Sequence, residues 1–225
     1  MSVVELTDAL LSSVDKPARY IGGELNSVNK AITPEMVRVA FAFPDVYEVG
    51  MSHLGMQILY HFFNRREDVF CERVFAPWMD FEEVMRKENI PLFAIESRDP
   101  VSEFDFIGFT LQYELSYTNI LNMLDLAKIP LRAADRKDLA PLVVAGGPCA
   151  CNPEPLADFV DIFFLGEGEE VDLEVIDLYK KYRDLGDKEA FLAAAAQIEG
   201  VCVPSLYNVE YNADGTVRRF RPHMR

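Results

Sequence analysis

The sequence repeats one pattern five times: a short segment of strand character is followed by a segment with helical spacing. The five strand-like segments are 36–43, 70–76, 104–112, 141–147 and 161–168. The last two are almost continuously apolar, as expected for strands covered on both faces. Parallel strands joined by right-handed helical crossovers form an open sheet. We therefore predict an α/β fold: a doubly wound, Rossmann or flavodoxin-like parallel sheet of about five strands with helices on both faces.

The pattern divides the chain into three expected parts. Residues 1–34 hold a short amphipathic helix and an irregular approach segment rich in Pro, Gly and Asn. Residues 35–186 carry the repeated pattern and form the α/β domain. Residues 187–225 contain one more helix and then a small β-hairpin that turns at Asn212–Gly215.

Charge and composition exclude several function classes. The chain has 37 acidic and 22 basic residues, a net charge of −15. Such a surface repels phosphate backbones and anionic lipid, so we predict neither a nucleic-acid nor a membrane partner. No segment reaches the ~18 apolar residues of a membrane span and the start lacks signal-peptide features, so we expect a cytoplasmic protein. The four cysteines and three histidines are too scattered to predict a metal site.

Glycines gather where the predicted strands end. They are Gly50 and Gly55, Gly146 and Gly147, and Gly166 and Gly168. Ligands of open α/β sheets bind beyond the carboxyl ends of the strands, and glycine lets a backbone approach a ligand closely. No phosphate-loop motif follows the first strand, and Glu167, Glu169 and Glu170 would repel a phosphate. The sequence therefore predicts a rim for a broad, mostly uncharged ligand.

Four segments resemble the cobalamin-binding domain found at the front of many radical S-adenosylmethionine (radical SAM) proteins. They are PDVYEVGMSHLG, FDFIGFTLQYELSYTN, VVAGGPCACNPEPLADFVD and FLGEGEE. The resemblance covers about two-thirds of the chain and is closest to an uncharacterised subfamily with a radical SAM domain downstream. It implies that the corrin ring lies across the carboxyl edge of the sheet, with the nucleotide tail between strand ends.

By match of motif, the resemblance implies four groups of cofactor-binding residues. They are Asp45, Ser52, His53 and Gly55, then Thr110, Leu111 and Tyr113, then Gly146 and Gly147, and finally Gly166, Glu167 and Gly168. The spacing of Asp45, His53 and Gly55 departs from the usual D-x-H-x-x-G signature. For His53 we therefore favour a hydrogen bond to the backbone in the first turn of a helix over 52–66, capped by Ser52, above cobalt ligation.

The resemblance places the reaction centre outside this chain. A radical SAM cluster needs three cysteines in a C-x3-C-x2-C loop, which Cys149 and Cys151 do not supply. We therefore expect no catalytic residues here, and the iron–sulfur cluster and S-adenosylmethionine only in a downstream radical SAM domain, the expected partner. Our hypothesis is a cobalamin-binding module of a radical SAM iron–sulfur enzyme. The alternatives are a cobalamin-free scaffold of the same fold and, less favoured, a free-standing flavodoxin-like domain.

Overall fold

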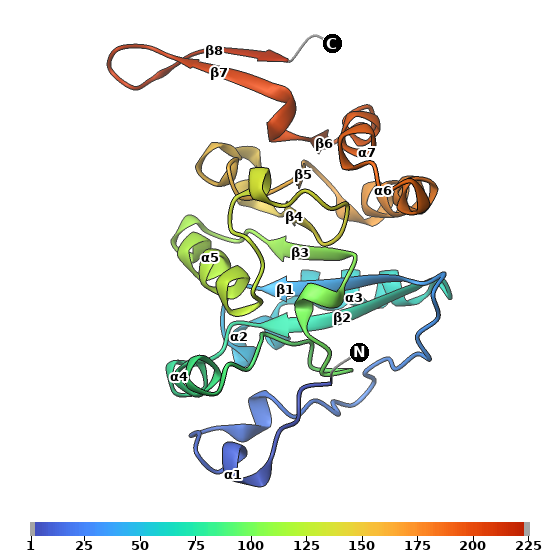
Figure 1. The fold of residues 1–225 in the computed structure, drawn as a ribbon, viewed down its shortest axis with the longest axis vertical. Coiled ribbons are helices and arrows are strands. Elements are labelled where there is room, and N and C mark those ends of the chain that lie inside the picture. The colour runs from blue at the N-terminus through green and yellow to red at the C-terminus, as the bar shows by residue number, and fades with distance from the viewer. Residues whose placement is uncertain (1–2, 223–225) are drawn as a thin grey trace.

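The computed structural model of the protein describes residues 3–222 and is built around one central sheet (Figure 1). The sheet order is β2-β1-β3-β4-β5-β6. The strands are β1 (Val37–Phe43), β2 (Val69–Phe75), β3 (Phe106–Thr110), β4 (Leu142–Gly146), β5 (Ile162–Phe164) and β6 (Val201–Cys202). Strands β1 to β5 are parallel, and β6 runs antiparallel to β5. The predicted doubly wound parallel sheet is confirmed, with β6 as an additional edge strand.

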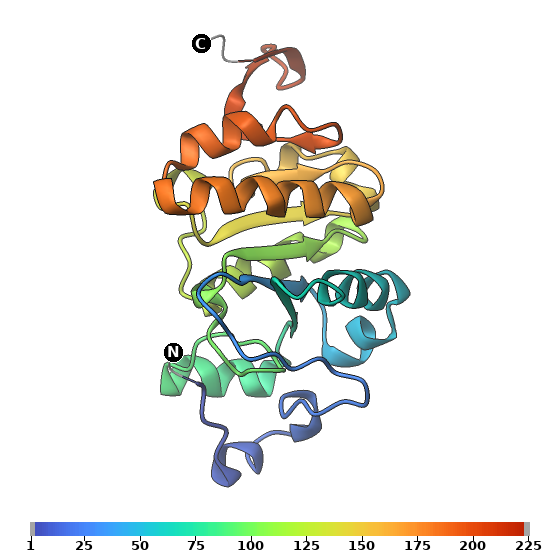
Figure 2. The same ribbon diagram turned by 90° about the vertical axis from the view of Figure 1, so that its right-hand side faces the viewer.

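Helices cover both faces of the sheet (Figures 1 and 2). Each face has its own cluster of buried side chains. On one face lie α3 (Leu54–Asn64), α6 (Gly168–Tyr182) and α7 (Lys188–Ala195). On the other face lie α4 (Met79–Glu88) and α5 (Tyr117–Leu126). Strand order reverses between β1 and β3, since the chain continues to β2 on one side and to β4 on the other. This reversal is the place where open α/β sheets bind ligands.

The connection after β1 differs from the predicted one. A short helix, α2 (Tyr47–Ser52), occupies it, so α3 begins at Leu54 and is capped by His53, not by Ser52. The buried face of α3 consists of Met56, Tyr60 and Phe63, whereas Leu54 is exposed. The apolar spacing therefore predicted the helix correctly but not its start, because α2 occupies the residues directly before His53.

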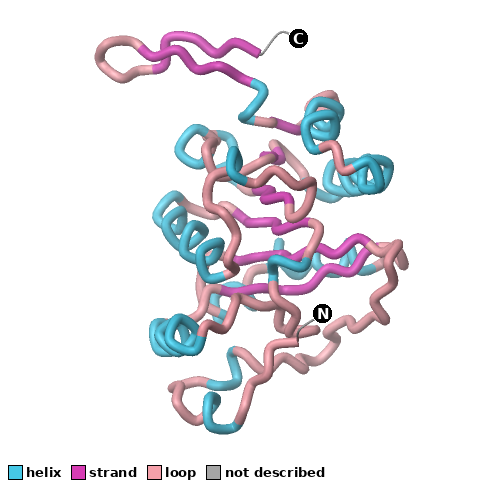
Figure 3. Tube along the Cα trace, in the orientation of Figure 1, coloured by secondary structure: helices cyan, strands magenta, loops and turns pink. Residues whose placement is uncertain are grey.

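The two ends of the described chain differ (Figures 1 and 3): the C-terminal end projects from the sheet, whereas the Val4 amide near the N-terminal end donates to the Arg98 carbonyl oxygen of the loop beside β2 at 2.8 Å. The N-terminal segment contains the short helix α1 (Asp8–Leu11) and a 3-10 turn (Pro17–Arg19), and otherwise runs irregularly toward β1. The C-terminal hairpin pairs β7 (Tyr207–Tyr211) with β8 (Val217–Pro222) and projects beyond β6. The predicted hairpin is therefore confirmed.

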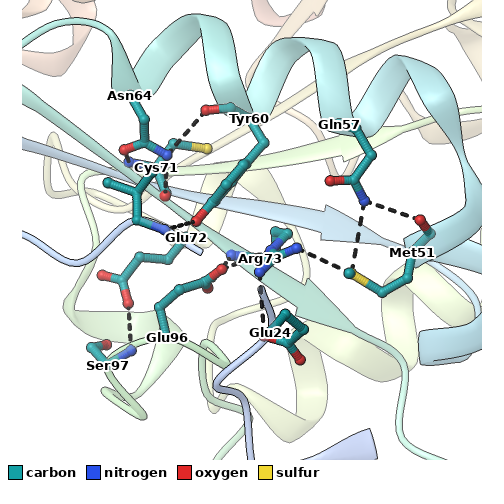
Figure 4. Close-up of polar contacts among 11 residues, drawn as sticks. Glu24, Met51, Gln57, Tyr60, Asn64, Cys71, Glu72, Arg73, Glu96 and Ser97 are labelled. Atoms are coloured by element: carbon teal, nitrogen blue, oxygen red, sulfur yellow. Dashed lines mark hydrogen bonds and ion pairs between the residues drawn. The ribbon is translucent and has the colours of Figure 1, made fainter. Parts of the chain in front are cut away.

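One edge of the sheet is closed by a loop (Figure 4). Strand β2 lies at this edge, and its Arg73 carbonyl oxygen accepts a hydrogen bond from the Ile95 amide at 2.9 Å. The Glu96 carboxylate accepts bonds from the Arg73 amide and from its guanidinium, both at 2.7 Å. The Glu72 carboxylate accepts the Ser97 amide at 2.9 Å. The Ile95 amide and the Glu96 carboxylate thus satisfy the Arg73 backbone groups that an edge strand would otherwise expose, and Glu72 ties the loop to the strand.

Candidate functional site

A cavity of about 250 Å³ lies between the sheet and the pair α3 and α6, reaching the carboxyl ends of the strands. Its floor is apolar and consists of Val39, Phe41, Phe106, Gly108, Val144 and Phe164. Its walls include Ile58, Leu59 and Phe63 of α3, and Val175 and Ile176 of α6. The strands β1 and β3 on either side of the order reversal both contribute to the floor. The cavity therefore occupies the position where this sheet topology binds ligands.

Eight of the twelve predicted cofactor-binding residues line this cavity. They are His53, Gly55, Thr110, Gly146, Gly147, Gly166, Glu167 and Gly168. They come from the ends of four different elements, so the fold brings together residues that are more than a hundred positions apart in the sequence.

The other four predicted residues do not line the cavity. The Asp45 carboxylate accepts a hydrogen bond from the Val46 amide at 2.7 Å, and Ser52 Oγ donates to the Val49 carbonyl oxygen at 2.8 Å. Leu111 is fully buried in the cluster on the opposite face of the sheet. Tyr113 is about half exposed at the start of the segment before α5. Asp45, Ser52 and Leu111 thus have local structural roles.

His53 is held by the start of α3. Its Nδ1 accepts a hydrogen bond from the Met56 amide at 3.1 Å, which caps the helix. Its ring centroid lies 5.2 Å from that of Phe43 at the end of β1. A side chain on Gly55 would place Cβ 3.0 Å from His53 Cε1. The hydrogen bond to the backbone that we favoured for His53 is therefore present.

Two of the glycines are required by packing. A Cβ on Gly50 would lie 2.4 Å from the Phe75 ring, and Gly50 is not part of the cavity. Gly147 has φ +103°, and a Cβ there would lie 2.9 Å from the Leu111 carbonyl oxygen. Gly166 differs because, although its φ is +109°, open space surrounds the position a Cβ would take. At the end of β5, a ligand can therefore approach the Gly166 backbone without meeting a side chain.

Asp172 is a cavity residue that the sequence interpretation missed. It lies in α6, one turn after Gly168, and its Oδ1 is buried without a hydrogen-bond partner among residues 3–222. Burial raises its pKa from 3.8 to about 7, and the charge of nearby Glu169 acts in the same direction. The available signal was its spacing, because Asp172 falls on the same helical face as the buried Val175 and Ile176.

The charge around the cavity is negative. Its lining includes Glu167, Glu169 and Asp172, but no Lys or Arg from the part of the chain that the structure describes. Gln112 also lines it and donates from Nε2 to Thr110 Oγ1 at 2.6 Å. An apolar floor with acidic and neutral polar groups at the side suits an uncharged or cationic ligand and disfavours an anionic one.

Within residues 3–222, no group of three or more His, Cys, Asp and Glu side chains is arranged to hold a metal ion. The same residues include no helix with the length and apolar character required to cross a membrane.

Comparison with known proteins identifies the family. Residues 55–204, from α3 through β6, match the family described as the N-terminal region of radical SAM proteins. The chain is 30% identical over 155 residues to an uncharacterized protein of Methanocaldococcus jannaschii. This stretch covers 64% of the chain but only 29% of that relative, so the chain spans less than a third of the relative's length. No solved structure matches the chain. Since the family match spans most of the sheet and its helices, this chain belongs to the family of radical SAM protein N-terminal regions.

Proposed function

We propose that this chain is the cobalamin-binding module of a radical SAM iron–sulfur enzyme. The observation that carries the proposal is the apolar cavity at the order reversal of a parallel sheet, bordered by strand exits that contain glycine. Membership of the radical SAM N-terminal family supports the enzyme context. In this proposal the chain itself performs no chemical step and positions the cofactor for a neighbouring domain.

The residues of the cavity fit part of such a cofactor. About 250 Å³ is too little for a whole corrin but admits a bicyclic ring, since a dry cavity of ~150 Å³ already binds benzene. The broader part of the cofactor would then lie outside, over Gly166 and Gly168, where a side chain is lacking. The other bordering residues would be His53, Gly55, Thr110, Gly146, Gly147 and Glu167. Bound cobalamin supplies a cobalt centre able to carry a methyl group.

We also propose that the C-terminal hairpin leads to the radical SAM domain, which would hold the iron–sulfur cluster and S-adenosylmethionine. One face of the hairpin is apolar: Val209 pairs with Phe220, and Tyr211 pairs with Val217. Phe220, Tyr211 and Val217 are about half exposed. A two-stranded hairpin is marginally stable alone in water, so a covering partner is expected for this face.

The extent of this linker follows from packing. Phe191 of α7 and Val203 after β6 are completely buried in the same cluster as α6. We therefore propose residues 35–203 as the cofactor module, 204–222 as the linker and 1–34 as an approach segment. This places the boundary later than the predicted position at 186, because the sequence did not reveal that α7 and β6 complete the sheet domain.

The cobalamin-free scaffold remains the second candidate. The observation in its favour is that Gly50, Gly147 and His53 all have structural roles that need no ligand. In that case the cavity would be a by-product of the fold.

A retention experiment tests the proposal. The purified chain is incubated with hydroxocobalamin and desalted, and its visible spectrum is recorded. Retained corrin absorbance near one equivalent supports the cobalamin module, whereas a colourless protein contradicts it and favours the scaffold. Gly108→Val adds a side chain on the floor of the cavity and should abolish retention. The fold should accept this residue, because its Cβ would lie at ordinary distances of 3.6 Å from Val144 Cγ2 and 3.8 Å from Phe41 Cδ2. Ala193→Val adds similar bulk at an exposed position of α7 and should leave retention unchanged.

A further inference from the structure

The buried carboxyl of Asp172 is the feature of the cavity that folding alone leaves unexplained. Its Oδ1 has no hydrogen-bond partner in residues 3–222. Leaving a buried polar atom unsatisfied is unfavourable, and native proteins contain few such atoms. An apolar side chain would suit this position of α6 better, because Val175 and Ile176 beside it pack on the sheet. Packing alone therefore does not explain why a carboxyl group occupies this position.

The atoms around Asp172 leave space for a ligand beside its carboxyl group. A Cβ on Gly168 would lie 3.0 Å from Asp172 Oδ2, so the missing side chain leaves room beside the carboxyl. Leu59 of α3 lies on the other side of the same gap, with Cδ2 3.6 Å from that Cβ position. Asp172, Gly168 and Leu59 all line the cavity. The carboxyl is thus bordered by an apolar wall and by bare backbone.

Burial raises the pKa of Asp172 to about 7, and the charge of Glu169 acts in the same direction. Glu169 and the buried thiol of Cys71 on β2 interact electrostatically with it, and Glu167 and His53 are the other titratable groups in the lining of the cavity. None of these is an arginine or lysine that could pair with a carboxylate. Near neutral pH the carboxyl therefore exists in both forms, and it can donate a hydrogen bond or accept one.

We propose that Asp172 is a ligand-binding residue that forms a hydrogen bond to the polar atom of an uncharged, flat nitrogen heterocycle entering the cavity. The apolar floor and walls would cover the ring, and the carboxyl would select rings that carry a nitrogen. The inference rests on the proposed function only in requiring that the cavity binds a ligand. It assigns a recognition role to a residue outside the motifs that resemble the cobalamin domain.

Two bicyclic probes of equal shape test this assignment. Benzimidazole carries ring nitrogens and indene does not, and the affinity of each for the full chain is measured by calorimetry or by ligand-observed NMR. Asp172→Leu and Asp172→Ala should weaken benzimidazole binding about tenfold, the value of one hydrogen bond, and leave indene binding within about twofold. Asp172→Asn should keep most of the benzimidazole affinity. Glu174→Leu removes an exposed carboxylate from the same helix and should change neither affinity.

Equal benzimidazole affinity in wild type, Leu and Ala variants would overturn the assignment. So would an equal loss of both probes in folded variants, since that indicates a damaged cavity and no specific contact. Hydroxocobalamin retention is read on the same proteins. If the protein retains cobalamin and its benzimidazole affinity is the same with and without Asp172, this inference alone is refuted. Benzimidazole binding that depends on Asp172, in a protein that retains no cobalamin, refutes the proposed function alone.

Discussion

Replacing Asp172 with Asn should raise the free energy of unfolding near pH 8 and have little effect near pH 4. Burial raises the pKa of this carboxyl from 3.8 to about 7 in the folded protein. Between these pH values the unfolded chain has released the proton that the folded protein still holds. Unfolding therefore becomes more favourable as the pH rises, and this loss of stability is complete above about pH 7.

The size of the effect follows from the two pKa values. They differ by about 3 pH units, and each unit corresponds to 1.36 kcal/mol, which gives ~4 kcal/mol as an upper limit. Asn has nearly the same shape but does not ionise. The stability of the Asp172→Asn variant relative to wild type should thus increase from about pH 4 to about pH 7 and then stay constant.

Urea denaturation of both proteins at about pH 4, 6 and 8 measures this difference. Glu174→Gln, an exposed substitution in the same helix, serves as the control and should differ from wild type by no more than about 0.5 kcal/mol at any of these pH values. A stability difference for Asp172→Asn that does not change with pH would refute the argument. So would a variant that is less stable than wild type near pH 8, because the buried charge would then carry no cost.

Three further substitutions probe contacts beside the site and at the closed β2 edge. Gly50→Ala should lower the free energy of unfolding by about 1–3 kcal/mol in urea denaturation, because its Cβ would lie 2.4 Å from the Phe75 ring; unchanged stability would show that the ring moves freely. His53→Ala should cost about 0.5–2 kcal/mol through loss of the α3 cap while cobalamin retention stays the same, and lost retention would instead assign His53 to the ligand. Glu96→Leu should cost about 3–5 kcal/mol by calorimetry, since it removes a buried partner of Arg73, and a cost below ~1 kcal/mol would contradict this role.

The sheet could be predicted because its strands are encoded locally. Segments such as 141–147 are continuously apolar, and five of them alternate with helical spacing, which leaves few topologies. Strand β6 escaped prediction because it has only two residues and exists through its pairing with β5. Helix α2 escaped because its segment contains Gly50 and no clear apolar period. In both cases the structure depends on distant contacts.

The candidate site could be predicted in outline but not in detail. The glycines after the strands indicated the correct edge of the sheet. Which glycine serves packing and which borders open space depends on residues far away in the chain, such as Phe75 beside Gly50 and Leu111 beside Gly147. Asp172 belongs to no recognisable motif, and it stands out only in the structure, where its buried Oδ1 has no hydrogen-bond partner among residues 3–222.

The closed edge at β2 limits how this protein can join another domain. The loop at 93–99 engages the amide and carbonyl groups of Arg73, and the Asn64 side chain engages those of Cys71, so β2 offers little template for an incoming extended peptide. The opposite border, β6, has just two residues. Continuation of the sheet into a neighbour by β-augmentation is therefore blocked. Attachment then has to use side-chain surfaces, such as the apolar face of the projecting hairpin formed by Val209, Phe220, Tyr211 and Val217.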